Sequence, residues 1–246
     1  MAFKKEVYEV CEMVANEFPG WKFVSGNFKN ISMKHSDLIV SPSFSFDHGF
    51  ANLQPCVMIN HKRSNKLYKK IIGYGAYVSQ INFQEMAFPL TYMPEHLRAT
   101  CMICEDKKSY LAAVHAPSQY YDKQRARTLE DGALDITQSI PVLKAIMKDG
   151  IAFIEKHYDL SSEEAFLKAL PAKYDTRNNI PYREMELQKG VMMCIVHILL
   201  GDFDFFELYC SDRYKTVFPK RSEELAKISA AVSGLKREYE KTGKII

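Results

Sequence analysis

The spacing of apolar residues changes along this chain, from every second position in the first quarter to every third or fourth position in the last hundred residues. Between residues 51 and 59 the odd positions carry Ala, Leu, Pro, Val and Ile, while Asn52, Gln54 and Asn60 hold much of the other parity. Such alternation is typical of a strand with one buried face. From Ser139 onward the apolar residues follow helical spacing, which predicts helices that bury one stripe.

The first sixty residues predict one helix followed by an antiparallel meander. The helix covers Phe3 to Phe18, because apolar residues recur at helical intervals until Pro19-Gly20 stops the run. Short alternating segments follow, separated by turn residues, at positions 21–23, 31–33, 44–46 and 51–59. We therefore predict about four strands, and the Gly73-Tyr74-Gly75 segment farther along predicts a tight turn.

Capping residues mark the helices of the second half. Ser139 is a predicted N-cap with Pro141 in the first turn, for a helix of about five turns. Ser161 with Glu164 three residues later predicts a capping box for a short helix. Further helices are predicted from the apolar spacing and the residues at their ends, namely Arg183–Leu200 before Gly201, one beginning at Asp202 and one capped by Ser222.

These patterns predict an α+β fold, with an N-terminal helix and antiparallel β-meander followed by a helical C-terminal half. We assign a helix-plus-sheet region to residues 1–120 and a helical region to residues 136–246, and we expect them to pack as one globular unit. The charged segment 118–135 lies between the two regions. A length of 246 residues is compatible with one large domain or with two small ones.

Composition and charge restrict the class of protein. Hydrophobic residues make up 47% of the chain, enough to fill a core, and the net charge of +3 is too small for a dedicated nucleic-acid-binding surface. The charged residues among the first twenty positions argue against a secretory signal, and the apolar run Val191–Leu200 is about half as long as a bilayer span. We expect a cytoplasmic protein without a membrane partner, in which the six Cys are reduced.

Cys101 and Cys104 form the only C-x-x-C pair, a spacing used in redox exchange or in half of a zinc site. His96 and His115 are close enough in sequence to complete four ligands, but ribbon-type zinc sites usually show a second tight pair. The sequence leaves metal binding at this pair open, and we favour two free thiols in a strand or core. We predict no resident metal and no cofactor.

Other chemically suggestive residues have simpler structural interpretations. No phosphate-binding loop, nucleophile elbow, zinc-protease motif or EF-hand is present. His197 lies inside an apolar run, which predicts a core histidine hydrogen-bonded to a neighbour. Asp202, Asp204 and Glu207 carry oxygens that suit a hard cation, but acidic residues at a helix start also satisfy free N–H groups and complement the helix dipole. We favour the second interpretation.

Two segments are candidate binding surfaces. The densest basic run is Lys62, Arg63, Lys66, Lys69 and Lys70, and in a helix its four lysines share one face. Such a face suits an acidic partner or phosphates, although charge runs are most often simply solvated. The segment from residue 110 to 121 is rich in tyrosine and includes Tyr120 and Tyr121, a composition that suits either a contact surface or a half-buried strand.

The order of elements resembles a group of uncharacterised bacterial domains that contain an Asn-Leu-Gln strand. The likeness rests on the leading amphipathic helix, Trp21-Lys22-Phe23, Phe50-Ala51-Asn52-Leu53-Gln54 and the Leu200-Gly201-Asp202 turn, and it covers roughly residues 3–60 and 190–240. Some of these domains are thought to be immunity proteins of toxin systems. The resemblance therefore implies an inhibitor that binds a toxin and blocks its active site, and it implies no catalytic residues.

Three functional hypotheses follow. The first is a non-catalytic cytoplasmic protein-binding module, in particular an immunity protein whose partner is a bacterial toxin domain. The second is an enzyme whose site is assembled from separated residues such as Cys104, His115 and Asp202. The third is a regulatory, nucleic-acid-associated module that uses the face from Lys62 to Lys70. The sequence specifies neither the partner nor the oligomeric state.

Overall fold

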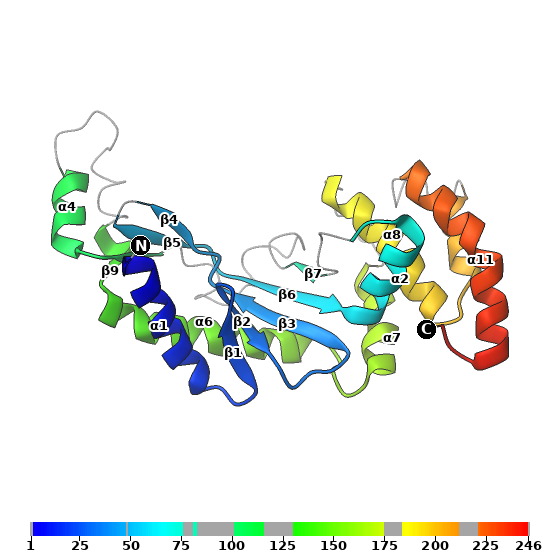
Figure 1. Cartoon of the computed structure of the whole chain (residues 1–246), viewed down its shortest axis with the longest axis horizontal. Helices are drawn as coiled ribbons and strands as arrows, with labels where there is room; N and C mark the ends of the chain where they lie inside the picture. Colours follow the sequence, from blue (N-terminus) through cyan, green and yellow to red (C-terminus); the bar gives the residue numbers. More distant parts are fainter. Residues whose placement is uncertain are drawn as a thin grey trace. The chain divides into compact units, whose positions relative to one another are not determined.

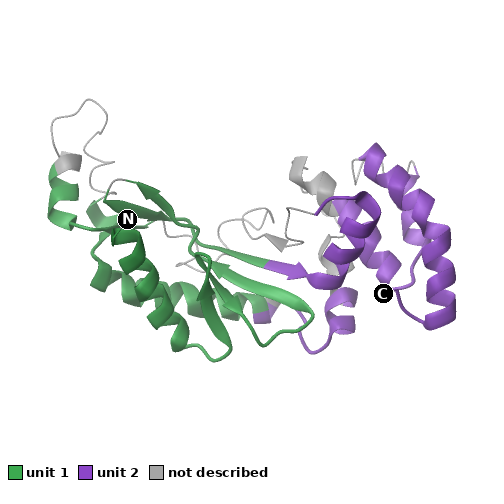
Figure 2. Ribbon diagram, in the orientation of Figure 1, with its two compact units in different colours: residues 1–58, 88–154 green, residues 59–87, 155–246 purple. Residues whose placement is uncertain are grey.

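Figure 1 shows a computed structural model of the chain, which describes residues 2–47, 49–75, 81–82, 101–115, 130–174, 184–211 and 221–245. The chain forms two compact units (Figure 2): unit 1 comprises residues 1–58 and 88–154, and unit 2 comprises residues 59–87 and 155–246. Strand β6 (Cys56–His61) and helix α6 (Ile136–His157) each carry the chain from one unit to the other.

Most strands belong to unit 1. Its elements, besides the first part of β6 and most of α6, are α1 (Ala2–Asn16), β1 (Trp21–Val24), β2 (Asn27–Asn30), β3 (Ser36–Ser41), β4 (Ser45–Asp47), β5 (Phe50–Leu53), β8 (Cys101–Cys104), α4 (Lys107–His115) and β9 (Ala133–Leu134). One sheet has the order β1-β2-β3-β6-β7, with β7 at Ile81–Asn82, and the other has the order β4-β5-β8-β9. The pairs β1–β2, β2–β3, β4–β5 and β5–β8 are antiparallel, and β8–β9 is parallel.

The predicted α+β class is confirmed. An N-terminal helix precedes antiparallel strands in meander order, and the C-terminal half is mostly helical. The predicted regions 1–120 and 136–246 follow this change in secondary structure along the chain. The two compact units follow spatial proximity instead, so each of them combines segments from both ends of the sequence.

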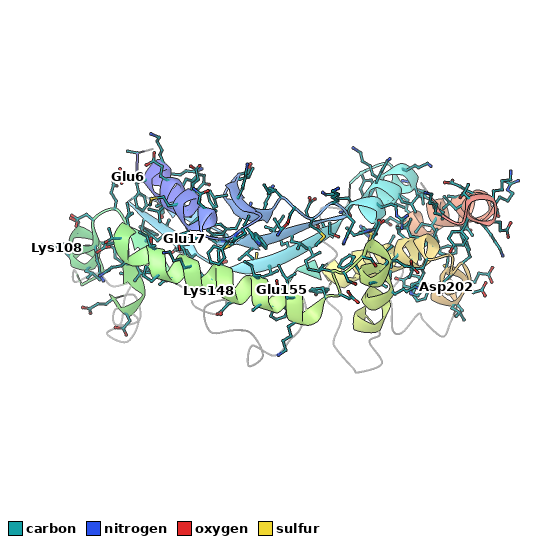
Figure 3. All side chains as sticks on the ribbon, turned by 90° about the horizontal axis from the view of Figure 1, so that it is seen from below. Glu6, Glu17, Lys108, Lys148, Glu155 and Asp202 are labelled. Carbon is teal, nitrogen blue, oxygen red and sulfur yellow. The ribbon has the colours of Figure 1, made fainter. Side chains whose placement is uncertain are left out.

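Helices α1 and α6 cover the same face of strands β1 to β3. Phe23 and Phe28 are directly opposite each other in the β1–β2 ladder, and the Tyr8 ring of α1 lies 5.1 Å from the Phe23 ring. Phe28 is opposite Val40 of β3, and a Cβ added at Gly150 of α6 lies 2.6 Å from a methyl group of that valine. Lys144 of α6 also pairs at 2.7 Å with Glu17, which directly follows α1 and is labelled in Figure 3.

The single strand predicted for residues 51–59 is wrong, because the structure has two strands there. β5 ends at Leu53 and belongs to the β4-β5-β8-β9 sheet, whereas β6 begins at Cys56 in the other sheet. Pro55 lies between them and has no N–H for a ladder hydrogen bond, while the Gln54 N–H donates to the Pro42 carbonyl. The alternation of apolar residues continues across the break, so the pattern alone does not reveal it.

Unit 2 is mainly helical. Its helices are α2 (Lys62–Ile72), α7 (Glu163–Tyr174), α8 (Glu184–Leu199), α9 (Asp204–Cys210) and α11 (Ser222–Thr242). α8 is central, since it packs against α2, α7, α9 and α11, and from Gly190 to Leu199 every residue except His197 is buried. A helix that is apolar on all sides is expected in a core. Among the described residues no helix is long and apolar enough to cross a membrane.

Three predicted helix starts need correction. Asp135, not Ser139, caps α6, because its carboxylate accepts the Gln138 N–H at 2.8 Å. Ser162, not Ser161, caps α7 by accepting the Ala165 N–H at 3.0 Å, while the Ser161 hydroxyl donates to Asp159. Ser222 is the first residue of α11 rather than its N-cap, which is Arg221. At α6 and α7 a neighbouring side chain accepts a free N–H of the first turn, whereas Arg221 makes no side-chain capping hydrogen bond at the start of α11.

Candidate functional site

The predicted basic helix is present as α2, and its lysines share one exposed face. We call Lys62, Lys66, Lys69 and Lys70 the lysine face; all four residues are exposed. At 100° per residue they span an arc of about 100° on the helix. The opposite side of α2 buries Ser64, Leu67, Tyr68 and Ile72. α2 packs against α8 and α11. The amphipathic pattern therefore turns the charges outward.

Positive charge is concentrated in α2. The helix contains five Lys and Arg residues and no Asp or Glu. The whole chain carries a formal charge of +3, so the residues outside α2 sum to −2. The small net charge thus conceals a local cationic helix. Because Lys69 and Lys70 lie in its last turn, they also interact favourably with the negative end of the helix dipole.

Arg63 does not share the exposure of the lysine face. Its side chain is 29% exposed and its Nε lies 3.1 Å from Glu163 Oε1 at the start of α7. The pair is partly buried, and a planar guanidinium is well suited to hold a carboxylate in this way. Arg63 therefore fixes α2 to α7, and the four lysines remain as the outward-facing cations among the five predicted binding residues of this helix.

His61 anchors the N-terminus of α2 through a network that the sequence did not predict. Its Nδ1 accepts the Ser64 N–H at 3.2 Å and lies 2.6 Å from the Ser64 hydroxyl, while its Nε2 lies 2.9 Å from Glu163 Oε1. Since Nδ1 accepts from a backbone N–H, the ring proton of the neutral form is on Nε2, which donates to Glu163. The imidazole thereby caps α2 and ties it to α7.

The order Ser64, His61, Glu163 superficially matches a nucleophile, a base and an orienting acid. The His61 side chain and Ser64 both have 0% exposure, so no substrate carbonyl reaches the hydroxyl in this structure. A nucleophile must contact the reacting atom, and this serine contacts its own helix cap instead. We therefore interpret the network as structural.

The C-terminal end of α2 is also held by specific contacts. Gly73 caps the helix in the left-handed conformation, with φ +96°, in agreement with the predicted turn at Gly73-Tyr74-Gly75. The Tyr74 hydroxyl donates to Glu224 of α11 at 2.8 Å, and this hydrogen bond is the main reason that the pKa of Tyr74 is raised to about 12. Lys227 donates to the Ile72 carbonyl at 3.0 Å. Both contacts join α2 to the beginning of α11.

The C-x-x-C pair lies in strand β8, where both cysteines are free and buried. Burial raises the pKa of Cys101 to about 11 and is also the main reason that the pKa of Cys104 is raised. Protonated, buried thiols are poor nucleophiles and poor metal ligands. Within the described part of the chain no group of three or more His, Cys, Asp or Glu residues is placed to hold a metal ion.

We expect thiol labelling to follow this burial. In the native protein Cys210, which is half-buried, should react first with iodoacetamide at neutral pH, because the other five cysteines are buried. Those five should become reactive only after unfolding in guanidinium chloride. Mass spectrometry of peptides after a short exposure gives the order. Rapid native labelling of Cys101 or Cys104 would contradict the assignment of these thiols to the core.

His197 and Asp202 form a local pair at the α8–α9 turn. His197 Nδ1 lies 2.7 Å from Asp202 Oδ2, and its ring stacks on Phe205 with 3.5 Å between centroids. Burial lowers the pKa of His197 despite the opposing effect of Asp202, so we assign a neutral ring that donates its Nδ1 proton to the carboxylate. Asp202 Oδ1 also accepts the Phe205 N–H at 3.3 Å at the start of α9 (Figure 3). The predicted hydrogen bond between His197 and a neighbour is confirmed. The helix predicted to begin at Asp202 begins at Asp204 instead, although Asp202 accepts one N–H of its first turn.

The lowered pKa of His197 predicts an acid-sensitive contribution to stability. Because the folded protein disfavours the protonated ring, this contribution is complete above the ordinary histidine pKa of about 6.5 and decreases as the pH falls below it. Replacement of His197 by Asn, which retains a side-chain N–H donor for Asp202, should flatten the decline in melting temperature between pH 7 and pH 5. Circular dichroism melts of both proteins measure the difference, and parallel curves would contradict the assignment.

The remaining predicted site residues belong to different parts of the chain. Cys104 belongs to unit 1 and Asp202 to unit 2. His115 is the last residue of α4, so the segment from Tyr110 to His115 is helical and the strand predicted as one alternative there is wrong. Tyr120, Tyr121 and His96 lie outside the described residues.

Comparison with known proteins identifies no relative of this chain. No protein-family model matches the chain, and no curated protein and no solved structure gives a significant match. The resemblance to bacterial domains with an Asn-Leu-Gln strand therefore gains no support from these comparisons, and the geometry of α2 is the basis for a functional proposal.

Proposed function

We propose that this protein is a non-catalytic protein-binding module that contacts an acidic surface of its partner through the lysine face. The observation that carries the proposal is the arrangement of α2, in which four lysines point outward from a helix whose other side is buried. Complementary charges across an interface accelerate association and exclude partners of the wrong charge. The residues outside α2 sum to a negative charge, so the attraction is directed to this helix.

The anchoring of α2 at both ends supports the same proposal. His61 and Arg63 bind Glu163 of α7 at the N-terminus, and Lys227 binds the Ile72 carbonyl at the C-terminus. A helix held in this way presents its lysines on a fixed backbone, which reduces the entropy lost on binding. The same contacts also stabilise the fold.

Within this class we propose an immunity protein that binds and blocks a bacterial toxin. This finer proposal rests on the resemblance of the sequence elements and on the need of an inhibitor for a rigid, charged contact surface. Because charges across an interface are complementary, the lysine face requires a toxin with an acidic patch at or beside its active site. A nuclease toxin, whose active site attracts phosphates, suits a cationic inhibitor less well than a toxin of another kind.

An affinity capture with matched variants tests the proposal. The tagged full-length chain is incubated with lysate of its native cells at moderate salt, and bound proteins are quantified by mass spectrometry. The test variant is Lys62→Glu/Lys66→Glu/Lys70→Glu, and the control variant is Lys236→Glu/Lys241→Glu/Lys244→Glu, whose three lysines are also exposed but lie on and just after α11. Both variants change the net charge equally, so they differ only in location.

We expect one stoichiometric protein partner that the native chain and the control variant retain and the test variant loses. Three reversed charges should weaken the complex by about a hundredfold or more, since close charge pairs across interfaces couple by roughly 1.5 kcal/mol or more each. Equal retention by both variants would contradict the use of the lysine face. Capture of nucleic acid instead, lost in the test variant and after nuclease treatment, would favour the nucleic-acid-associated alternative.

A further inference from the structure

The β1–β2 hairpin in unit 1 carries a second surface, independent of the lysine face. Trp21 and Phe28 on one side of this hairpin are buried, and the ladder register places Lys22 directly opposite Lys29 on the other side. Val24 lies on this second side beside Lys22, and Ile31, whose N–H donates to the Gly20 carbonyl, lies there beside Lys29. We call Lys22, Val24, Lys29 and Ile31 the hairpin face.

The two lysines of this face are like charges directly across a strand pair. Side chains at such positions have Cβ atoms about 4.5–5.5 Å apart, and like charges there are destabilising. Neither Lys22 nor Lys29 forms an ion pair with any carboxylate of the described residues. An anion that binds between the two ammonium groups relieves this repulsion, so the pair favours an acidic group from outside the chain.

Two exposed apolar side chains flank the lysine pair. Val24 is 43% exposed and Ile31 is 57% exposed, and they are two of the five large hydrophobic residues that the described structure exposes. Along the hairpin each of them lies two residues from the lysine row, Val24 within β1 and Ile31 in the bend that follows β2, on opposite sides of that row. The face therefore presents an apolar group, a double positive charge and a second apolar group in line.

We propose that the hairpin face binds an extended protein segment in which an acidic residue lies between two apolar residues, each two positions away. A strand has the same spacing as the hairpin, so its carboxylate reaches Lys22 and Lys29 while its apolar side chains cover Val24 and Ile31. In the described part of the chain β1 is also the edge strand of its sheet, so its outer side pairs with no other strand there.

Other occupants fit the same face less well. A nucleic acid requires more than two cations for phosphate contacts and aromatic rings for stacking, and the aromatic residues of this hairpin are on its opposite side. An anionic membrane surface calls for larger apolar anchors and a denser basic cluster than two lysines provide. A short acidic and apolar segment matches both the charge and the size of the surface.

Selection of displayed peptides that bind the chain tests this proposal. A library of seven-residue peptides is selected against the native chain, against Lys22→Glu/Lys29→Glu, and against the test variant of the lysine face, Lys62→Glu/Lys66→Glu/Lys70→Glu. The hairpin variant keeps two like charges in the same ladder positions, so it preserves the repulsion and reverses only its sign. Circular dichroism establishes that each of the three proteins is folded.

The native chain and the lysine-face variant should both enrich peptides of the pattern apolar-x-acidic-x-apolar, and the hairpin variant should enrich a basic central residue instead. A selected acidic peptide should bind the hairpin variant at least about tenfold more weakly than the native chain. Enrichment of the same peptides by all three proteins, or no enrichment by the native chain, would overturn the proposal. Binding of duplex DNA or phosphatidylserine vesicles that depends on Lys22 and Lys29 would also overturn it. Because the lysine face is tested separately, failure here leaves the proposed function intact.

Discussion

Replacement of Gly201 by Ala should lower the free energy of unfolding by about 2–5 kcal/mol, because it combines two separate costs. Gly201 follows α8 with φ +79°, a left-handed conformation that disfavours any residue with a Cβ. A Cβ at this position would also overlap the Tyr239 ring of α11. The ring is half-buried and its hydroxyl donates to the Leu200 carbonyl, so it cannot move aside without losing contacts.

Gly243 provides a matched control for this prediction. It ends α11 with φ +70°, but a Cβ there meets no atom within 4 Å. The substitution Gly243→Ala therefore isolates the backbone strain, about 1–2 kcal/mol, and the difference between the two variants measures the clash with Tyr239. Urea unfolding followed by circular dichroism gives both values. Equal losses in the two variants would contradict the close packing of α11 on the α8–α9 turn.

Replacement of Gly150 by Ala should also destabilise the protein, although Ala is the better helix former by about 1 kcal/mol. The added Cβ lies 2.6 Å and 2.7 Å from the two methyl groups of Val40, which is fully buried in β3. Overpacking of a core typically costs about 1–3 kcal/mol, so the clash should outweigh the gain in helix propensity. Urea unfolding of the variant measures the net loss.

A second substitution separates the clash from other effects at this position. In the background Val40→Ala the methyl groups that obstruct Gly150→Ala are absent, so the same change should become neutral or stabilising. Gly234→Ala in α11 is the matched helical control, because a Cβ there meets no atom within 4 Å, and it should raise stability by up to about 1 kcal/mol. A stabilising Gly150→Ala in the native background would disprove the contact between α6 and β3.

The lysine face was predictable from the sequence because helical spacing alone places its residues on one side. The contacts that anchor α2 could not be predicted in this way. Glu163, which binds His61, is 102 residues away in the chain, and no local pattern predicts a contact at that separation. Histidine is also not among the residues that usually cap helices, so the sequence offered no signal for its role at the start of α2.

Helix and strand boundaries show the same division between local and long-range information. Residues near Ser161 compete for the first turn of α7, and Ser162 becomes the cap because the Ser161 hydroxyl is engaged by Asp159. The hairpin face had a local signal, since Lys22 and Val24 alternate with Trp21 and Phe23. Only the register of β1 with β2, however, places Lys29 opposite Lys22 and makes the surface recognisable.

If the lysine face is the contact surface for a protein partner, reversal of its charges should abolish tight binding of that partner. The captured partner is purified and titrated into three proteins in a calorimeter. These are the native chain, Lys62→Glu/Lys66→Glu/Lys70→Glu and Lys236→Glu/Lys241→Glu/Lys244→Glu, each at 50 mM and 300 mM salt. We predict that only the native chain and the control variant bind tightly at low salt, and that both weaken at high salt. An unchanged affinity in the lysine-face variant, or an affinity of the native chain that does not depend on salt, would contradict the claim.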